Sequence, residues 1–351
     1  MESAAFAILR VVEILDETGI SDCVLALRRG ELVILPTDTV YGLGARALDE
    51  AAVRKIFVAK GRPETHPLIV HVQGMADARE LVEEWPEIAT AFAEVYWPGP
   101  LALILPRSSR VPDAVTGGGP TVALRSPAHP LAQELLRALG EPIAAPSANR
   151  YQTLSPTRLS HIDDALAKHV TYALDGGPSE RGIESTVLDL SGDGPRVLRP
   201  GSITLEMLRV IDPRTELANT VQETGIRASP GLDRKHYAPR TPLFVLDNTA
   251  LLERLAGKEV CAVVHFSARE NFATTEVGTS KRDAPHVFFE VPKDARGYAH
   301  ALFATLHDAD AAHVAAILVE SPPTTDEWLG VRDRLTRAAN SENESTKGKS
   351  E

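Results

Sequence analysis

The 351-residue sequence is poor in the features that mark secreted and membrane proteins. It has only two cysteines, Cys23 and Cys261, far apart in apolar surroundings. Two cysteines are too few for a disulfide framework or a zinc finger, and this favours a cytoplasmic protein. No apolar run has the length of a transmembrane helix. The N-terminal stretch MESAAFAILRVVEILDE lacks a basic region and mixes acids with apolar residues, so we expect an amphipathic helix there, no secretion signal and no membrane association.

Positive charge is also scarce. The chain has 37 Lys and Arg against 48 Asp and Glu, a net charge of −11, which argues against a general binder of nucleic-acid backbones. The P-loop pattern GxxxxGK[ST] is absent, and no GxGxxG follows a predicted strand in the C-terminal half. A bound nucleotide would therefore be held mainly by side chains rather than by a P-loop.

Apolar runs and helical patterns divide the chain into two globular blocks. In the first block, residues 1–213, the stretch DEAAVRKIFVAKG predicts a helix with Asp49 as N-cap and Gly61 as C-cap. HPLAQELLRALG predicts another helix, and a further one follows Thr157. The predicted strands are LVILPT, PLIVHV, LALILP, TVALR, PIAAPS, YALDG, STVLDL and RVLRP. They are too closely spaced for a simple parallel series, so we predict a mixed twisted sheet with flanking helices.

The second block, residues 242–340, alternates more regularly. Its apolar runs PLFVLD, EVCAVVHF, HVFFEVP and AAILVES are separated by helical patterns, which predicts a smaller Rossmann-like α/β domain. Residues 214–241 are mostly polar and predict a linker. Residues 341–351 are polar and charged, and we expect them to be disordered.

Polar residues of the first block gather at the ends of the predicted strands. PTDTVYGLGARA suggests a turn at Gly-Leu-Gly with Thr37, Thr39 and Tyr41 exposed. Lys60 and Arg62 follow a helix, where they could simply complement its dipole. Each such cluster alone is explained by a cap, a turn or a surface charge. Together, cations interleaved with hydroxyl and amide donors describe a pocket for a phosphorylated ligand such as a nucleotide.

Two histidines of this block, His66 and His71, could suggest a metal site. No acid or cysteine lies at ligand spacing around them, so we do not predict a zinc site. The residues by themselves therefore indicate a mixed α/β domain that binds a nucleotide or another phosphorylated ligand.

Seven stretches, taken in order, resemble a known family. They are PTDTVYGLGARA, AKGRPETHPLIVHV, WPGPLALIL, VALRSPAHP, IAAPSANRYQTLSPT, DGGPSERGIESTVLDL and LRPGSIT. Over residues 20–211 the chain resembles the YrdC-like threonylcarbamoyl-AMP synthases. SPGLDRKHYAP and the second block resemble the long form of these enzymes, so the resemblance covers nearly the whole chain and implies a YrdC-like fold with an added C-terminal domain.

The resemblance implies a nucleotidyltransferase. It would join L-threonine, bicarbonate and ATP, with Mg²⁺ accompanying the ATP, to give L-threonylcarbamoyl-adenylate and pyrophosphate. A tRNA threonylcarbamoyltransferase complex would then modify adenosine in tRNA, so that tRNA is met only indirectly. Such a displacement needs alignment and charge neutralisation more than a strong base.

The resemblance also implies roles for individual residues. The pairing of Lys-Gly-Arg with Ser-Ala-Asn is its most diagnostic feature and supplies the catalytic set Lys60, Arg62, Ser147 and Asn149. The implied ATP contacts are Lys60, Arg62, His66, Thr121, Ser147, Asn149, Ser155, Arg199, His236 and Tyr237. The implied L-threonine contacts are Thr39, His71, Arg125, Ser185 and the backbone of Ala145. His66 stands where many relatives have Asn, and the linker would close over the nucleotide as a lid carrying His236 and Tyr237.

Two other functions compete with this interpretation. Relatives of this domain have been interpreted as double-stranded RNA binders, in which case the basic cleft would hold backbone phosphates. The net charge of −11, together with Arg125 and Ser185, favours a small-molecule pocket. Carbamoyl-transfer enzymes of hydrogenase maturation carry zinc-finger modules, and two cysteines are too few for these.

Overall fold

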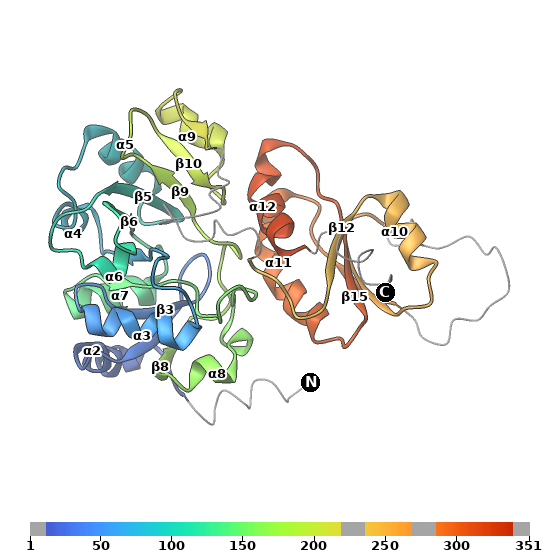
Figure 1. Cartoon of the computed structure of the whole chain (residues 1–351), viewed down its shortest axis with the longest axis horizontal. Helices are drawn as coiled ribbons and strands as arrows, with labels where there is room; N and C mark the ends of the chain where they lie inside the picture. The colour runs from blue at the N-terminus through green and yellow to red at the C-terminus, as the bar shows by residue number, and fades with distance from the viewer. Residues whose placement is uncertain (1–11, 219–235, 269–271, 273–285, 340–351) are drawn as a thin grey trace, which may run out of the picture.

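The computed structural model describes residues 12–218, 236–268, 272 and 286–339, which form two α/β units side by side (Figure 1). The first unit is built on an eleven-stranded sheet and the second on a four-stranded sheet. Helices α11 (Ala295–Asp310) and α12 (Leu329–Ala338) of the second unit face the first (Figure 1).

The large sheet mixes parallel and antiparallel strands, as predicted. Its spatial order is β1-β8-β2-β3-β7-β4-β6-β5-β9-β10-β11. Strand β2 pairs parallel with β8 but antiparallel with β3, and β4 pairs parallel with β6 but antiparallel with β7. In chain order the strands are β1 (Glu13–Leu15), β2 (Leu32–Leu35), β3 (Gly42–Arg46), β4 (Ile69–His71), β5 (Leu101–Pro106), β6 (Thr121–Arg125), β7 (Ile143–Ala144), β8 (Val170–Leu174), β9 (Thr186–Asp189), β10 (Arg196–Arg199) and β11 (Glu216–Leu217).

Helices cover both faces of this sheet. Strand β2 shows why: Ile34 packs into a core with α3, whereas Val33 packs into a core with α2 and α7. Alternate residues of a strand point to opposite faces, so an apolar run without alternation is buried on both. The helices of this unit are α2 (Ile20–Arg28), α3 (Glu50–Lys60), α4 (Met75–Arg79), α5 (Glu87–Tyr96), α6 (Asp113–Thr116), α7 (Pro130–Leu139), α8 (Asp164–Ala167) and α9 (Leu205–Ile211).

Helix α3 begins and ends where the sequence predicts. The Asp49 carboxylate accepts a hydrogen bond from the Ala52 amide at 3.1 Å, and Gly61 adopts a left-handed conformation with φ of 62°. Glycine adopts this conformation without a steric penalty and so ends the helix. The chain turns there, and Lys60 and Arg62 on either side of Gly61 are both buried.

The predicted Gly-Leu-Gly turn is wrong, because these residues belong to strand β3. A Cβ atom on Gly44 would lie 2.8 Å from a methyl carbon of Leu35 on β2. Glycine is therefore required here for close packing between neighbouring strands rather than for a turn. Thr37, Thr39 and Tyr41, which we expected to be exposed, are buried as well.

The expected N-terminal helix is wrong where it can be compared. Residues 13–15 form strand β1, which pairs parallel with β8 along the edge of the sheet, and backbone pairing there outweighs the helical pattern. Residues 1–11 lie outside the described residues. So do residues 219–235 of the predicted linker and the predicted disordered tail at 341–351. Strand β11 extends the first sheet to Leu217.

The second unit is a Rossmann-like α/β domain, as predicted. Its strands are β12 (Leu243–Leu246), β13 (Cys261–His265), β14 (Val287–Glu290) and β15 (Ala316–Glu320), all parallel in the order β12-β15-β13-β14. Helix α10 (Asn248–Leu255) packs on one face, and α11 and α12 pack on the other. Within the described part of the chain, no helix is long and apolar enough to span a membrane.

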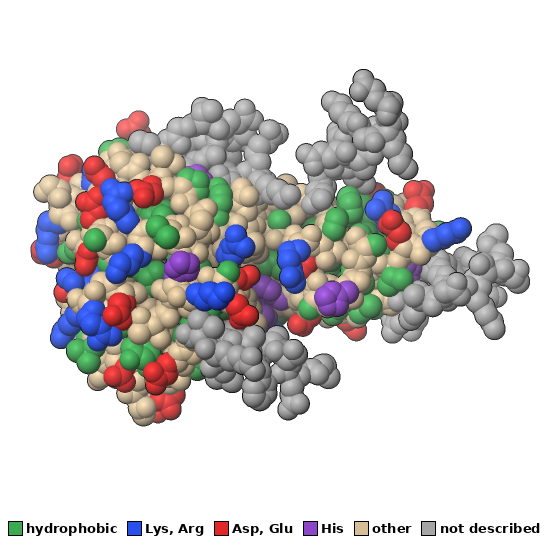
Figure 2. Space-filling view, turned by 60° about the horizontal axis from the view of Figure 1, so that its bottom comes forward, with side chains coloured by type: hydrophobic (Ala, Val, Ile, Leu, Met, Phe, Trp, Pro, Cys, Tyr) green, Lys and Arg blue, Asp and Glu red, His purple; other side chains and the backbone are tan. Residues whose placement is uncertain are grey.

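The two units share an apolar core edged by polar contacts. Val40, Leu154 and Ile183 of the first unit pack in one cluster with side chains of α11 and α12. Nδ1 of His300 lies 2.8 Å from the Glu180 carbonyl oxygen. Figure 2 shows histidine, basic and acidic side chains gathered along the boundary between the units.

Candidate active site at the strand ends

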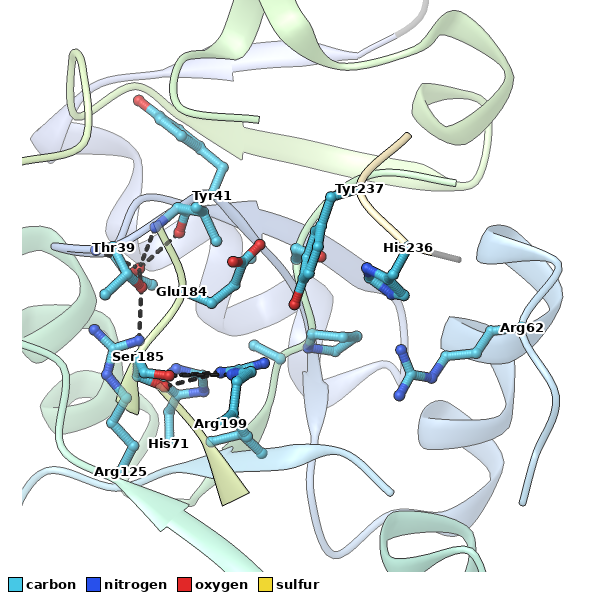
Figure 3. A pocket seen from close by; sticks show the side chains of 17 residues that line it. Thr39, Tyr41, Arg62, His71, Arg125, Glu184, Ser185, Arg199, His236 and Tyr237 are labelled. Carbon is cyan, nitrogen blue, oxygen red and sulfur yellow. Dashed lines mark hydrogen bonds between the residues drawn. The ribbon is translucent and has the colours of Figure 1, made fainter. Parts of the chain in front are cut away.

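A hollow opens where several strands of the large sheet end (Figure 3). Its empty volume, which includes space open to solvent, is about 540 Å³. Loops after β2 and β7, the last residues of β4, β6 and β10, and the residues before β9 supply its walls. The lining residues are Thr37, Thr39, Val40, Tyr41, Gly42, Arg62, Ile69, His71, Arg125, Ala145, Pro146, Ser147, Glu184, Ser185, Arg199, His236 and Tyr237.

Arg125 is fixed at one end of this hollow. Its guanidinium donates to the Asp38 carboxylate, to the Thr39 hydroxyl at 2.7 Å and to the Gly99 carbonyl at 3.0 Å. These bonds use three of the five N–H donors of an arginine. Burial lowers the Arg125 pKa, while the adjacent Asp38 carboxylate opposes this effect. The side chain is therefore held in place, and these bonds leave two of its N–H donors unused.

His71 lies next to Arg125, because β4 and β6 pair in parallel with these two residues opposite each other. Burial and the Arg125 charge lower the His71 pKa to about 3. The ring is therefore neutral at physiological pH. A neutral imidazole can accept one hydrogen bond as well as donate one.

Ser185 and Arg199 form the wall between the two ends of the hollow. The Arg199 guanidinium donates to the Ser185 carbonyl at 3.0 Å and to the Ser185 hydroxyl at 3.1 Å. The strand order explains the contact, because β10 pairs antiparallel with β9, which Ser185 precedes. In Figure 3, Thr39, His71 and Arg125 gather at one end, Arg62 and His236 lie at the other, and Arg199 lies between them.

Lys60 does not line the hollow, but it holds the backbone of a turn in the wall. Its fully buried ammonium donates to the carbonyl oxygens of Ser147 and Asn149. Burial is the main cause that lowers its pKa well below the usual value, and the nearby Arg62 charge adds to this. One ammonium thus fixes the turn that carries Ser147.

His236 and Tyr237 close the hollow on the side of the second unit. The His236 amide donates to the Arg337 carbonyl of α12 at 3.0 Å, and Tyr237 packs 5.6 Å, between ring centroids, from Phe303 of α11. Tyr237 has a φ of 59°, a conformation rare for residues other than glycine and costly to maintain. Burial and the charge of Arg62 lower the His236 pKa well below its usual value.

Several polar atoms in or beside the hollow are buried without a hydrogen bond to any described residue. They are Asp38 Oδ2, His71 Nδ1, Asn149 Oδ1, His236 Nδ1 and Tyr237 Oη. A buried polar atom left in this way costs about 1–3 kcal/mol. Their concentration in one place is typical of a binding site rather than of a packed core.

Comparison with known proteins covers both units. Residues 25–201 match the family model Sua5_yciO_yrdC, described as "Telomere recombination", and residues 203–340 match the model "Threonylcarbamoyl-AMP synthase, C-terminal domain". The chain is 37% identical to the threonylcarbamoyl-AMP synthase of Pyrococcus abyssi, over 95% of this chain and 97% of that protein. It is 38% identical to the threonylcarbamoyl-AMP synthase of Bacillus subtilis, over 93% and 96%.

The chain belongs to the threonylcarbamoyl-AMP synthase family. The fold agrees along its length with the crystal structure of P. abyssi Sua5 complexed with L-threonine. The TM-score is 0.82 at 33% sequence identity, over 94% of this chain and 97% of the other.

Ten of the fifteen residues to which the resemblance gives a role line the hollow. They are Thr39, Arg62, His71, Arg125, Ala145, Ser147, Ser185, Arg199, His236 and Tyr237. The other five, Lys60, His66, Thr121, Asn149 and Ser155, do not line it. Lys60 donates to the turn at Ser147, and Asn149 is part of that turn. The Ser155 hydroxyl donates to the Glu184 carboxylate behind the wall.

Three residues in or beside the hollow were given no role from the sequence. Glu184 lines the hollow and Asp38 holds Arg125, and both stand inside the motifs that carry the family resemblance. Their position next to Ser185 and Thr39 in the sequence could have indicated them. Arg334 reaches Glu184 from α12, 150 residues further along the chain, and no local pattern in the sequence indicated it.

Proposed function

We propose that this protein joins L-threonine, bicarbonate and ATP into L-threonylcarbamoyl-adenylate with release of pyrophosphate. The observation that carries the proposal is the convergence of three buried arginines, Arg62, Arg125 and Arg199, on one hollow lined with hydroxyls. An amino acid carboxylate and a triphosphate both require such donors. The name of the relatives, threonylcarbamoyl-AMP synthase, is matched over both units and supports the product of this reaction.

We place L-threonine at the Arg125 end. The two N–H donors of Arg125 that remain after Asp38, Thr39 and Gly99 can pair with the substrate carboxylate. The His71 ring is neutral, and its buried Nδ1 atom has no hydrogen-bond partner among the described residues. This nitrogen can therefore accept a hydrogen bond from the substrate. The hydroxyls of Thr39 and Ser185 and the backbone of Ala145 complete this end.

We place ATP at the Arg62 end, with Arg199 between the two substrates. Arg62, Arg199 and Ser147 line the hollow and would contact the phosphates, while His236 and Tyr237 would cover the nucleotide. Lys60 and Asn149 would act in part through the turn at Ser147. Contacts of His66, Thr121 and Ser155 with ATP would need the nucleotide to extend beyond the hollow.

Magnesium would enter with the nucleotide. Among the described residues, no group of three or more His, Cys, Asp or Glu side chains could hold a metal ion. Glu184, the acidic residue in the lining, already binds Ser155 and Arg334. Mg²⁺ bound through phosphate oxygens and water fits this set of residues, since Mg²⁺ usually keeps several waters.

The residues suit a displacement at phosphorus. The threonine amine and bicarbonate condense to a carbamate with loss of water, a carbamate oxygen attacks the α-phosphate, and pyrophosphate leaves. Arg62 and Arg199 would stabilise the negative charge on the phosphates, and Arg125 would align the amino acid. The carbamate and the adenylate are both labile, so His236 and Tyr237 would protect them by excluding water.

The product implies a consumer. We infer that a tRNA threonylcarbamoyltransferase complex in the cytoplasm takes the threonylcarbamoyl group to tRNA, and that this protein meets tRNA only indirectly. The proposed division of labour assigns residues 1–213 to catalysis, 214–241 to the linker and lid, and 242–340 to the domain that holds the linker.

Pyrophosphate release from MgATP tests the proposal. Release should require both L-threonine and bicarbonate, and L-serine should be a poor substitute. Release without bicarbonate would indicate ordinary aminoacyl-adenylate formation instead. If no pyrophosphate is released and the protein retains double-stranded RNA with a steep salt dependence, the RNA-binding function is correct.

A further inference from the structure

Arg334 of α12 forms a buried ion pair with the first unit. Its Nε atom donates to the Glu184 carboxylate at 2.7 Å, and its other nitrogens donate to the Glu184 carbonyl at 3.2 Å and the Pro200 carbonyl at 2.8 Å. The Arg334 side chain is 0% exposed and that of Glu184 is 8% exposed. The rigid guanidinium fork therefore holds two separate segments of the first unit at once.

These two segments carry residues of the hollow. Glu184 precedes Ser185 and Pro200 follows Arg199, and the Arg199 guanidinium donates to Ser185. Arg334 thus holds the backbone beside both members of the Ser185–Arg199 contact. The second carboxylate oxygen of Glu184 accepts from the Ser155 hydroxyl, which extends the network to a residue implied in ATP binding.

Arg334 also contacts Tyr237. The guanidinium carbon lies 5.3 Å from the centre of the Tyr237 ring, within the range of a cation–π interaction. Tyr237 lines the hollow and keeps its unfavourable left-handed backbone conformation. The same arginine therefore supports the wall of the hollow and the residue that covers it.

We propose that Arg334 is a positioning residue, through which the C-terminal domain sets the shape of the substrate site. It does not line the hollow, and it acts through Glu184, the Ser185–Arg199 contact and Tyr237. The inference rests on the proposed synthase function and adds to it a role for the C-terminal domain beyond carrying the linker. An arginine that merely joined the two units would affect stability but not the affinity of the folded protein for its substrates.

The Michaelis constant separates these two roles, because it does not depend on how much of the protein is folded. We would measure KM and kcat of the full chain for ATP and L-threonine in Arg334→Met and Arg334→Lys, below the melting temperature of each. Arg332→Met is the matched control, because Arg332 lies on the same helix and donates to the Thr324 carbonyl within the second unit. Its KM values should equal those of the wild type.

Arg334→Met should raise KM for both substrates about ten- to a hundredfold, the effect of losing one hydrogen bond to a charged group. Arg334→Lys should give a smaller increase, because an ammonium lacks the planar fork. In the Arg334→Met background, Glu184→Gln should lower KM again, since it removes a buried carboxylate that has lost its cationic partner and would repel ATP.

KM values within twofold of the wild type in either Arg334 variant would overturn the inference. If Arg334→Met is not obtained as folded protein, Arg334→Lys decides by the same measure. The proposed function itself fails in a different way, namely if the wild type releases no pyrophosphate that depends on threonine and bicarbonate.

Discussion

Gly182 gives a sharp test of how closely the two units approach. Its φ is 75°, and a Cβ atom added there would lie 2.3 Å from the His300 carbonyl oxygen and 2.5 Å from the Ala299 carbonyl oxygen, both on α11. Gly177, in the same loop, has a φ of 70°, but nothing lies within 4 Å of an added Cβ. Replacing each glycine by alanine therefore separates backbone strain from the clash between units.

The two substitutions should differ by the cost of moving α11. A residue other than glycine in the left-handed conformation costs about 1–2 kcal/mol, and Gly177→Ala should lose about this much free energy of unfolding. Gly182→Ala carries the same strain, and α11 must also move by about 1 Å to restore an ordinary contact. Overpacking of this kind adds about 1–3 kcal/mol.

Urea unfolding of both variants at equal protein concentration measures the difference. Gly182→Ala should lose more stability than Gly177→Ala and release pyrophosphate more slowly, because Tyr237 packs against α11 at Phe303. Equal losses in the two variants would refute the close packing of α11 against this loop.

Two further predictions concern buried titratable side chains. Asp38→Asn removes the carboxylate partner of buried Arg125. It should lower the free energy of unfolding by about 3 kcal/mol and raise KM for threonine more than KM for ATP. Urea unfolding and steady-state kinetics measure these two effects, and unchanged values would show that the ion pair contributes nothing. Stability should also fall below pH 6.5, because burial lowers the pKa of His71 to about 3 and that of His161 to about 2, whereas histidine in the unfolded chain takes up protons near pH 6.5. The unfolded state then binds more protons, so each of the two histidines lowers the free energy of unfolding by about 1.4 kcal/mol per pH unit. Urea unfolding at pH 7.5 and pH 5 measures this loss of stability, and the loss should be smaller in His161→Phe. Equal stability of the wild type at the two pH values would contradict the burial of these histidines in their neutral form.

The sequence predicted most strands and the limits of α3, because local patterns determine these features. Asp49 and Gly61 carry cap signals that work within a few residues of the helix ends. Gly44 shows where local patterns fail. Its role depends on Leu35 of the adjacent strand, so the same letters that favour a turn in isolation serve close strand packing in the sheet.

The residues of the site were predicted unevenly for a similar reason. Arg125 and Ser185 stand in motifs that resemble the family, and both lie in the hollow. Arg334 belongs to a helix of the other unit and reaches Glu184 only through the docking of the two units. Neither periodicity nor motif spacing reports such a contact, because it depends on how the two sheets are arranged relative to each other.

Following the carbon of bicarbonate into the product tests directly whether this protein makes threonylcarbamoyl-adenylate. The full chain would be mixed with MgATP, L-threonine and bicarbonate labelled with a heavy carbon isotope. The mass of the adenylate would then be measured by mass spectrometry before it hydrolyses. We expect threonylcarbamoyl-adenylate that carries one labelled carbon, formed in step with pyrophosphate. An unlabelled threonyl-adenylate, or AMP formed without any adenylate of threonine, would contradict it.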